Sequence, residues 1–276
     1  MTIAPAPYPR LSQAIGLIIA VLVLQAVIVF LLTTSVPGGL KAAHLPSLLI
    51  VANLLSFGLV IAWAVRRTGL PFLEALPFAA VGPAVYLPLI ITIAGFGILL
   101  SEADNLVRWV LPMPEFIAEA FRQIGGGGAA SLLAIVVVAP VVEELLLRGI
   151  MLRGFLGRYW PGTAVILSAL IFATMHLNPY QFASALAMGL VLGWIFYRTG
   201  SLWPCIIGHA LFNAQGFILT TVLPFRIRGY NPETLDTSTV EFQPLWFDIT
   251  GLGLAALGLV LLGRVLRGEA TRDTAP

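Results

Sequence analysis

The chain has 276 residues, of which 10% are charged and 59% hydrophobic, and its mean hydropathy is +0.97. A soluble domain carries roughly a quarter charged residues, because its surface must be polar, so these values exclude an ordinary soluble protein. The net charge of +2 gives no support for binding to nucleic acid. The single cysteine, Cys205, excludes an internal disulfide and a cysteine-rich zinc site.

Eight apolar runs predict membrane-spanning helices, since a helix needs about 20 apolar residues to cross the hydrocarbon. In chain order they are 14–33, 47–65, 78–100, 131–147, 163–177, 182–197, 201–221 and 246–263. The first run is too long for the apolar part of a signal peptide and is interpreted as a retained span. The predicted fold is therefore all-α: a polytopic bundle of about eight transmembrane helices, with residues 1–276 forming a single integral membrane domain.

Basic residues in the connections predict that both termini are cytoplasmic, because cytoplasmic loops carry an excess of Lys and Arg. The connections then placed in the cytoplasm hold ten arginines: Arg10, Arg66, Arg67, Arg148, Arg153, Arg158, Arg198, Arg264, Arg267 and Arg272. The opposite connections hold five basic residues: Lys41, Arg108, Arg122, Arg226 and Arg228. The long connections 101–130 and 224–244 are expected outside the membrane, with the glycine run 125–128 as a flexible joint. The expected location is the cell membrane.

Away from the ends of the predicted spans, acidic residues and histidines occur at only three places. Glu143 and Glu144 lie in the fourth run, His176 in the fifth and His209 in the seventh. An ionisable residue at the centre of a span costs roughly 2.5–3.5 kcal/mol on insertion scales, so such residues are functional candidates by default.

Helical spacing gives each candidate a partner. Glu144 and Arg148 are four residues apart, so they share a face and can pair, whereas Glu143 is rotated away by about 100°. Pro140, just upstream, is expected to kink the helix and free a carbonyl. Phe172 precedes His176 by four residues, and Asn213 follows His209 by four.

These side chains are suited to hydrolysis of an acyl bond. A carboxylate and an imidazole can orient a water molecule and take its proton, while an imidazole and an amide can donate hydrogen bonds to an oxyanion. One carboxylate and two histidines, here Glu143, His176 and His209, also match the ligands of some hydrolytic zinc sites. Both routes stay open, and zinc is kept as an alternative cofactor. Cys205 is interpreted as a small apolar residue, with a Cys–His pair as a minor alternative.

Three motifs in chain order resemble those of the CPBP family of intramembrane proteases, which includes the type II CAAX prenyl endopeptidases and bacterial abortive-infection proteins. They are Glu143-Glu144 with Arg148, Phe172 with His176, and His209 with Asn213. The motif-bearing catalytic core covers 131–221. The resemblance implies an eight-helix fold with a conical cavity open to the cytosolic side.

The resemblance also implies a role for each residue. Glu143 activates the water with assistance from His176, His209 and Asn213 form the oxyanion hole, and Glu144 with Arg148 supports the site. The substrate is then a membrane-associated protein or peptide, prenylated or not, in contact with the bilayer. Two other hypotheses remain open, a proton-coupled transporter and a non-catalytic immunity or scaffold protein.

His176 lies about 20 Å from the cytoplasmic end of its span, deeper than Glu143 and His209. This difference in depth predicts that the fourth helix continues beyond Arg148 and that the fifth span is short. The uncharged turn after it is expected to place Asn178 as the cap and Pro179 as the first residue of the next helix.

Overall fold

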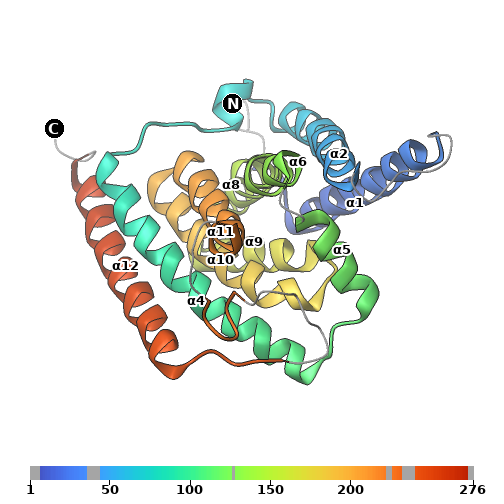
Figure 1. Cartoon of the computed structure of the whole chain (residues 1–276). Coiled ribbons are helices and arrows are strands. Elements are labelled where there is room, and N and C mark those ends of the chain that lie inside the picture. Colours follow the sequence, from blue (N-terminus) through green and yellow to red (C-terminus); the bar gives the residue numbers. More distant parts are fainter. Residues whose placement is uncertain (1–6, 36–43, 126–127, 222–225, 232–239, 273–276) are drawn as a thin grey trace, which may run out of the picture.

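The computed structural model describes residues 7–35, 44–125, 128–221, 226–231 and 240–272, with side chains described up to residue 218 in α11 and 267 in α12. Within these residues the protein is helical and contains no strand, which confirms the predicted all-α class. Figure 1 shows α11 near the centre, with α4 and α12 along one flank and α1 and α2 along another. The glycine run at 125–128 lies partly outside the described residues, as does most of the loop at 224–244.

Each of the eight apolar runs overlaps a helix of the structure. In chain order the helices are α1 (Leu11–Thr34), α2 (Leu45–Thr68), α4 (Tyr86–Val110), a long helix from α6 (Ala129–Leu132) to α8 (Arg153–Leu156), α9 (Pro161–Met175), α10 (Pro179–Thr199), α11 (Trp203–Thr221) and α12 (Leu245–Arg272). Shorter elements are α3 (Phe72–Ala75), η2 (Pro83–Val85) and α5 (Glu115–Gly125). Within the described residues, six helices are long and apolar enough to cross a membrane, and α9 is a shorter apolar helix. A total of eight spans and the cytoplasmic termini stay predictions.

The long central helix contains two π-helical segments. It passes through the π-helix η3 (Leu133–Val138), α7 (Ala139–Glu144) and the π-helix η4 (Leu145–Leu152) before α8. It therefore continues beyond Arg148, as the depth argument predicts. A π-helix is rare and often marks a functional site, because it shifts the side chains that follow it around the helix axis.

Small residues let neighbouring helices approach closely where the core is built. On α4, a Cβ at Gly95 would lie 2.7 Å from the carbonyl oxygen of Gly251 on α12. On α10, a Cβ at Gly189 would lie 2.9 Å from Ala169 of α9, as expected for a Gly-x-x-x-Gly packing face. Since α9 and α10 carry two sides of the candidate site, this packing sets the width of the site.

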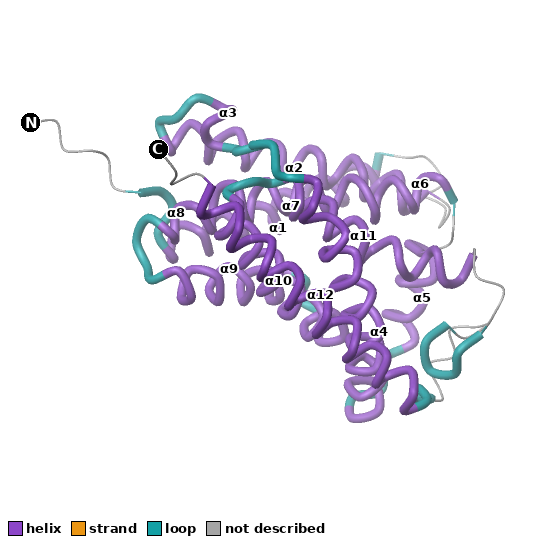
Figure 2. The backbone as a smooth tube through the Cα atoms, turned by 90° about the vertical axis from the view of Figure 1, so that its left-hand side faces the viewer, coloured by secondary structure: helices purple, strands orange, loops and turns teal. Residues whose placement is uncertain are grey.

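The helix bundle has two chemically distinct ends. At the first, which we call the terminal end, Tyr8 and Pro9 pack against Gly154 of α8, and Arg198 donates to the carbonyl of Leu266 near the end of α12. At the second, the α5 end, the final turns of α4 meet α5, the turn at 226–231 and the start of α12. Figure 2 shows α3 and α8 at one end of the molecule and α5 and α6 at the other.

Exposed tryptophans lie toward both ends of the bundle, as interfacial anchors should. Trp63, Trp160 and Trp203 lie toward the terminal end, and Trp109 and Trp246 toward the α5 end. Each presents much of its ring at the protein surface. The helices between the two sets expose apolar side chains, which suits contact with lipid.

Substitution of Gly95 tests whether α4 and α12 depend on backbone contact. We expect Gly95→Ala to lower the free energy of unfolding by about 1–3 kcal/mol, because the added methyl group overpacks a close helix crossing. The matched control is Gly253→Ala on α12, where a Cβ would meet nothing within 4 Å. Thermal unfolding in detergent measures both, and equal melting temperatures for the two variants would contradict the proposed contact.

Candidate active site

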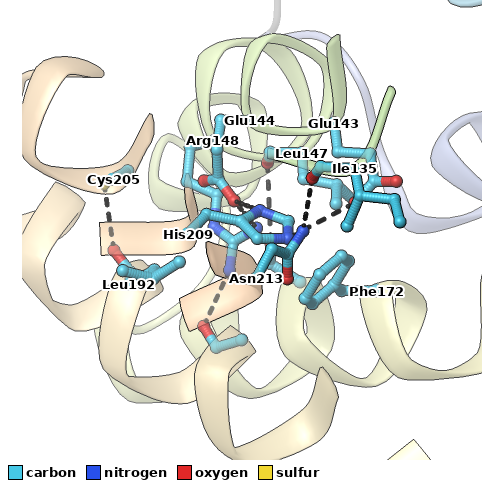
Figure 3. A network of polar contacts seen from close by, with 12 residues as sticks. Ile135, Glu143, Glu144, Leu147, Arg148, Phe172, Leu192, Cys205, His209 and Asn213 are labelled. Carbon is cyan, nitrogen blue, oxygen red and sulfur yellow. Dashed lines mark hydrogen bonds and ion pairs between the residues drawn. The ribbon is translucent and has the colours of Figure 1, made fainter. Parts of the chain in front are cut away.

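The structure brings the seven predicted site residues together from three parts of the chain, and Figure 3 labels all of them except His176. The central helix carries the two glutamates and the arginine, the end of α9 carries the phenylalanine and one histidine, and α11 carries the other histidine and the asparagine. The residues are Glu143, Glu144, Arg148, Phe172, His176, His209 and Asn213. Polar and ring contacts link the first six, and Asn213 lies one helical turn beyond His209.

A buried ion pair forms the base of this cluster. The Nη1 atom of Arg148 donates to Oε1 of Glu144 at 2.9 Å, and both side chains are 0% exposed. Arg148 also donates through Nη2 to the carbonyl of Gly189 on α10 at 3.2 Å. Oε2 of Glu144 and Nε of Arg148 have no hydrogen-bond partner. The pair therefore joins the central helix to α10 and supports the residues above it, as its four-residue spacing predicts.

His209 is held in one orientation by Glu144. Its Nδ1 lies 2.9 Å from Oε1 of Glu144, the oxygen that also accepts from Arg148. Because an ionised carboxylate can only accept, Nδ1 carries the proton and donates it. The other ring nitrogen, Nε2, then faces Oε2 of Glu143 at 3.8 Å. This separation is too long for a direct hydrogen bond. A water molecule can bridge two polar atoms at such a distance.

Phe172 separates the two histidines and gives each ring an apolar neighbour. Its ring centroid lies 5.1 Å from that of His176 and 5.4 Å from that of His209, both edge-on. The guanidinium carbon of Arg148 lies 5.0 Å from the same ring, within the range of a cation–π contact. Phe172 thus contacts the ion pair on one side and both imidazoles on the other.

His176 lies directly after α9, at the start of a tight turn. Its Nδ1 donates to the carbonyl of Phe172 at 2.8 Å, which leaves Nε2 as an acceptor in the neutral ring. The turn then places Asn178 as the cap of α10, where its Oδ1 accepts from the backbone N–H of Tyr180 at 3.0 Å, and Pro179 opens the helix. This predicted turn is confirmed. Since α9 has only 15 residues, it is shorter than the helices that are long enough to cross a membrane.

Asn213 bonds a carbonyl that Pro140 leaves without a backbone donor. In η3 the N–H of Ala139 bonds the carbonyl of Ala134, one residue earlier than in an α-helix. The donor five residues after Ile135 would be Pro140, which has no N–H. Nδ2 of Asn213 donates to the carbonyl of Ile135 at 2.9 Å instead. The freed carbonyl expected from Pro140 therefore orients the amide of Asn213 and leaves its second N–H for another acceptor.

A cavity of about 440 Å³ lies beside Asn213. The resemblance implied a cavity, but the sequence did not predict its lining. The cavity extends toward the α5 end, and its polar lining includes Ser101, Ser184 and Gln215. Tyr230 also lines the cavity, and burial raises the pKa of its phenol to about 12, so the hydroxyl stays protonated at neutral pH. One signal was present in the sequence: residues 115–125 have the amphipathic periodicity of a helix lying along a membrane surface, and α5 forms there.

Comparison with known proteins adds an independent observation. Residues 126–215 match the family model described as "Type II CAAX prenyl endopeptidase Rce1-like", and this segment contains all seven site residues. This segment is therefore similar to the core of a CPBP family protease. Searches of curated proteins and of solved structures give no match. The family supports an integral membrane endopeptidase of the CAAX type, without specifying the chemistry of water activation.

Zinc binding by Glu143, His176 and His209 stays a prediction. Among the described residues, no three His, Cys, Asp or Glu side chains are placed to bind one metal ion. His209 and His176 both use Nδ1 for protein partners, and Glu143 approaches only the first of them closely. Cys205 is buried and donates to the carbonyl of Leu192 at 3.3 Å, away from His209 (Figure 3). It therefore has the structural role predicted for it.

The buried pair allows a direct test of what supports the CPBP site. We expect Arg148→Met to lower the free energy of unfolding by about 3–5 kcal/mol, because Glu144 is left as an unpaired buried charge. The double variant Glu144→Leu/Arg148→Met should recover part of this loss, since neither charge remains. Thermal unfolding in detergent measures both, with Arg122→Met on the surface of α5 as the control that changes little. A single variant as stable as wild type would show that the pair does not support the site.

Proposed function

We propose that the protein is an intramembrane endopeptidase in which Glu143 activates a water molecule without a metal ion. The observation that carries this proposal is the arrangement of Glu143 against His209, 3.8 Å apart in a largely buried site. Glu143 is 13% exposed on its side chain and makes no direct hydrogen bond among the described residues. A carboxylate in this position is free to accept a proton from water, which its neighbour Glu144 is not.

The proposed reaction needs two proton transfers, one from water to Glu143 and one from Glu143 to the leaving group. Glu143 takes a proton from the water, whose oxygen attacks the carbonyl carbon of the scissile peptide bond. Nε2 of His176 is an acceptor in the neutral ring and assists by accepting a hydrogen bond from the same water. When the tetrahedral intermediate collapses, Glu143 returns the proton to the leaving nitrogen, so that an acid and an amine are released.

The oxyanion of that intermediate is stabilised by His209 and Asn213. The amide of Asn213 has one N–H on the carbonyl of Ile135 and a second N–H for the oxyanion. Because Nδ1 of His209 donates to Glu144, its Nε2 can donate as well only when the ring carries both protons. Two carboxylates, Glu143 and Glu144, flank this ring, and Glu144 fixes its orientation. The buried ion pair therefore acts on the chemistry through His209.

The substrate class follows from the family and the membrane setting. The substrate is a membrane-associated protein or peptide, with or without a prenyl group, that reaches the site from the bilayer or its surface. The protein acts as a single integral domain of the cell membrane, with both termini in the cytoplasm and residues 131–221 as its catalytic core.

Replacing Glu143 tests the proposed function. Glu143→Gln removes the base but keeps the size of the side chain, so we expect loss of cleavage with an unchanged melting temperature. The measurement is proteomics of membrane fractions from cells that produce wild-type or variant protein, read for C-terminally truncated proteins. Cys205→Ala is the matched control, because Cys205 lies next to the site but faces away from it. Identical truncations with wild-type and Glu143→Gln protein would refute the role of Glu143.

Metal analysis tests the metal-free step separately. We expect purified, active protein to contain zinc at well below one ion per chain and to keep its activity after treatment with a chelator. The reason is that Glu143 and the two histidines do not converge on one point among the described residues. Stoichiometric zinc, with activity lost on chelation and restored by added zinc, would replace this step with metal-assisted hydrolysis.

A further inference from the structure

A second cavity, of about 210 Å³, lies at the terminal end of the bundle, and we call it the terminal cavity. Its wall includes Tyr8 of the N-terminal segment, Thr68 at the end of α2, Ala75 of α3, and Gly149 and Arg153 of the central helix. Figure 2 shows α3 and α8 at this end of the molecule. None of the seven site residues lines the terminal cavity, so the proposed reaction does not use it.

The N-terminal wall of the terminal cavity rests directly on the backbone of the central helix. A Cβ at Gly154 would lie 2.4 Å from the backbone nitrogen of Pro9, and one at Gly157 would lie 2.7 Å from Pro7. The Nε atom of Arg158 donates to the carbonyl of Pro7 at 2.8 Å. Two glycines and an arginine therefore hold the N-terminal segment in place, and the cavity beneath it is a built feature of the fold.

The terminal cavity has a positively charged wall. Arg153 is held by a hydrogen bond from Nη1 to the backbone carbonyl of Glu74, which uses one of the five N–H groups of its guanidinium. The guanidinium carbon of Arg67 lies 5.8 Å from the ring centroid of Trp63, and this ring lies 6.3 Å from that of Tyr8. The described lining contains no acidic residue. An anion in this cavity therefore meets one arginine directly and has a second nearby.

The hydroxyl of Tyr8 lacks the partner that a buried polar group requires. Its oxygen is buried and has no hydrogen-bond partner among the described residues. Burial raises the pKa of this phenol, and the charge of Arg67 opposes the rise, so the hydroxyl is protonated at neutral pH and can donate. A buried hydroxyl without a hydrogen bond is destabilising. An acceptor oxygen of a ligand in the terminal cavity would satisfy it.

Apolar side chains are exposed beside this basic cavity. Leu70, which lines the cavity, is 39% exposed, and Phe72 and Leu73 at the start of α3 are 56% and 76% exposed. Trp63, one turn before the end of α2, presents half of its surface and is an interfacial residue by type. A free anion has no use for such a rim, whereas a molecule with an anionic head and hydrocarbon chains contacts both surfaces.

The size of the terminal cavity limits what can enter it. Sites for whole small molecules are usually about 300–1,000 Å³. At about 210 Å³ the cavity holds a phosphate headgroup, while the chains of a lipid would stay outside on the apolar rim.

We propose that the terminal cavity binds the phosphate headgroup of an anionic phospholipid. Arg153 and the hydroxyl of Tyr8 donate to its phosphate oxygens, Arg67 adds positive charge, and the acyl chains lie against Leu70 and α3. The terminal end is the arginine-rich end that the sequence predicts to be cytoplasmic, and the cytoplasmic leaflet carries the anionic lipids that basic pockets between helices bind. The bilayer itself would thus supply the ligand. This proposal does not depend on the proposed function.

Titration with a short-chain lipid tests the site. Delipidated protein in a neutral maltoside detergent is titrated with dioctanoyl phosphatidylglycerol in a calorimeter, and we expect one saturable site per chain. Tyr8→Phe and Arg153→Gln should each weaken binding at least about tenfold, because each removes a hydrogen bond to a charged group. The matched controls are Tyr197→Phe and Arg264→Gln, at the same end but on α10 and α12, and both should bind as wild type does. Figure 1 shows α12 on a different flank from α2.

Thermal unfolding separates binding from a loss of structure. The lipid should raise the melting temperature of the wild-type protein, since a ligand that binds only the folded state stabilises it, and should not raise that of Tyr8→Phe/Arg153→Gln. Without lipid, Tyr8→Phe should be at least as stable as wild type, because it removes an unpaired buried hydroxyl. A lower melting temperature of delipidated Tyr8→Phe would show that the hydroxyl already has a partner in the protein, against the proposal.

Two other ligands distinguish the source of the phosphate. Inorganic phosphate and dioctanoyl phosphatidylcholine, added at the same concentrations, should bind at least about tenfold more weakly than the anionic lipid, because the first has no chains and the second carries a cation. Equal binding of inorganic phosphate would make this a site for a free anion and overturn the lipid. Equal binding of phosphatidylcholine would overturn the preference for an anionic head. Binding that ignores Tyr8→Phe and Arg153→Gln, or no saturable binding, would overturn the site.

Discussion

The buried pair of Glu144 and Arg148 is the interaction on which the rest of the site depends. Two charges without solvent exposure are costly in a membrane helix unless each is paired and hydrogen-bonded. Their partners come from three helices: the central helix supplies both charges, α10 a carbonyl, and α11 the ring of His209. These helices can meet only if α10 also packs closely on α9, which the small residues at Gly189 and Ala169 allow. The need to pair the buried charges of Glu144 and Arg148 therefore determines helix packing over much of the bundle.

The two glutamates have different roles because their side chains point in different directions from one helix. Glu144 is fully buried, and its Oε1 accepts from both Arg148 and His209, so this carboxylate is held in place by the protein. Glu143, one residue earlier, points toward the open side of the cluster and stays available for water. Adjacent residues on a helix differ in direction by about 100°, which is enough to separate a structural carboxylate from a reactive one.

The sequence could predict most of the helices and the members of the site, because both depend on local patterns. Apolar runs of sufficient length locate helices, and four-residue spacings pair Glu144 with Arg148. Spacing cannot predict the bond from Asn213 to Ile135, which joins residues 78 positions apart and exists only once α11 lies against the central helix. The π-helices are missed for the same reason, since their winding is stabilised by tertiary contacts. The lining of the cavity is missed because it comes from α4, α5, the central helix, α10, α11 and the turn at 226–231.

The two π-helices of the central helix also have different surroundings. Toward the terminal end, η4 directs consecutive apolar side chains into the core, and the residues around Arg148 are packed without exposed surface. Toward the α5 end, the carbonyl of Ile135 turns away from the ladder of its own helix and is met by a polar side chain at the edge of a cavity. An exposed polar backbone group requires water or a polar partner, whereas a close-packed apolar layer excludes both. The two π-helices, one on each side of the glutamates, thus have a close-packed layer beside one of them and the cavity beside the other.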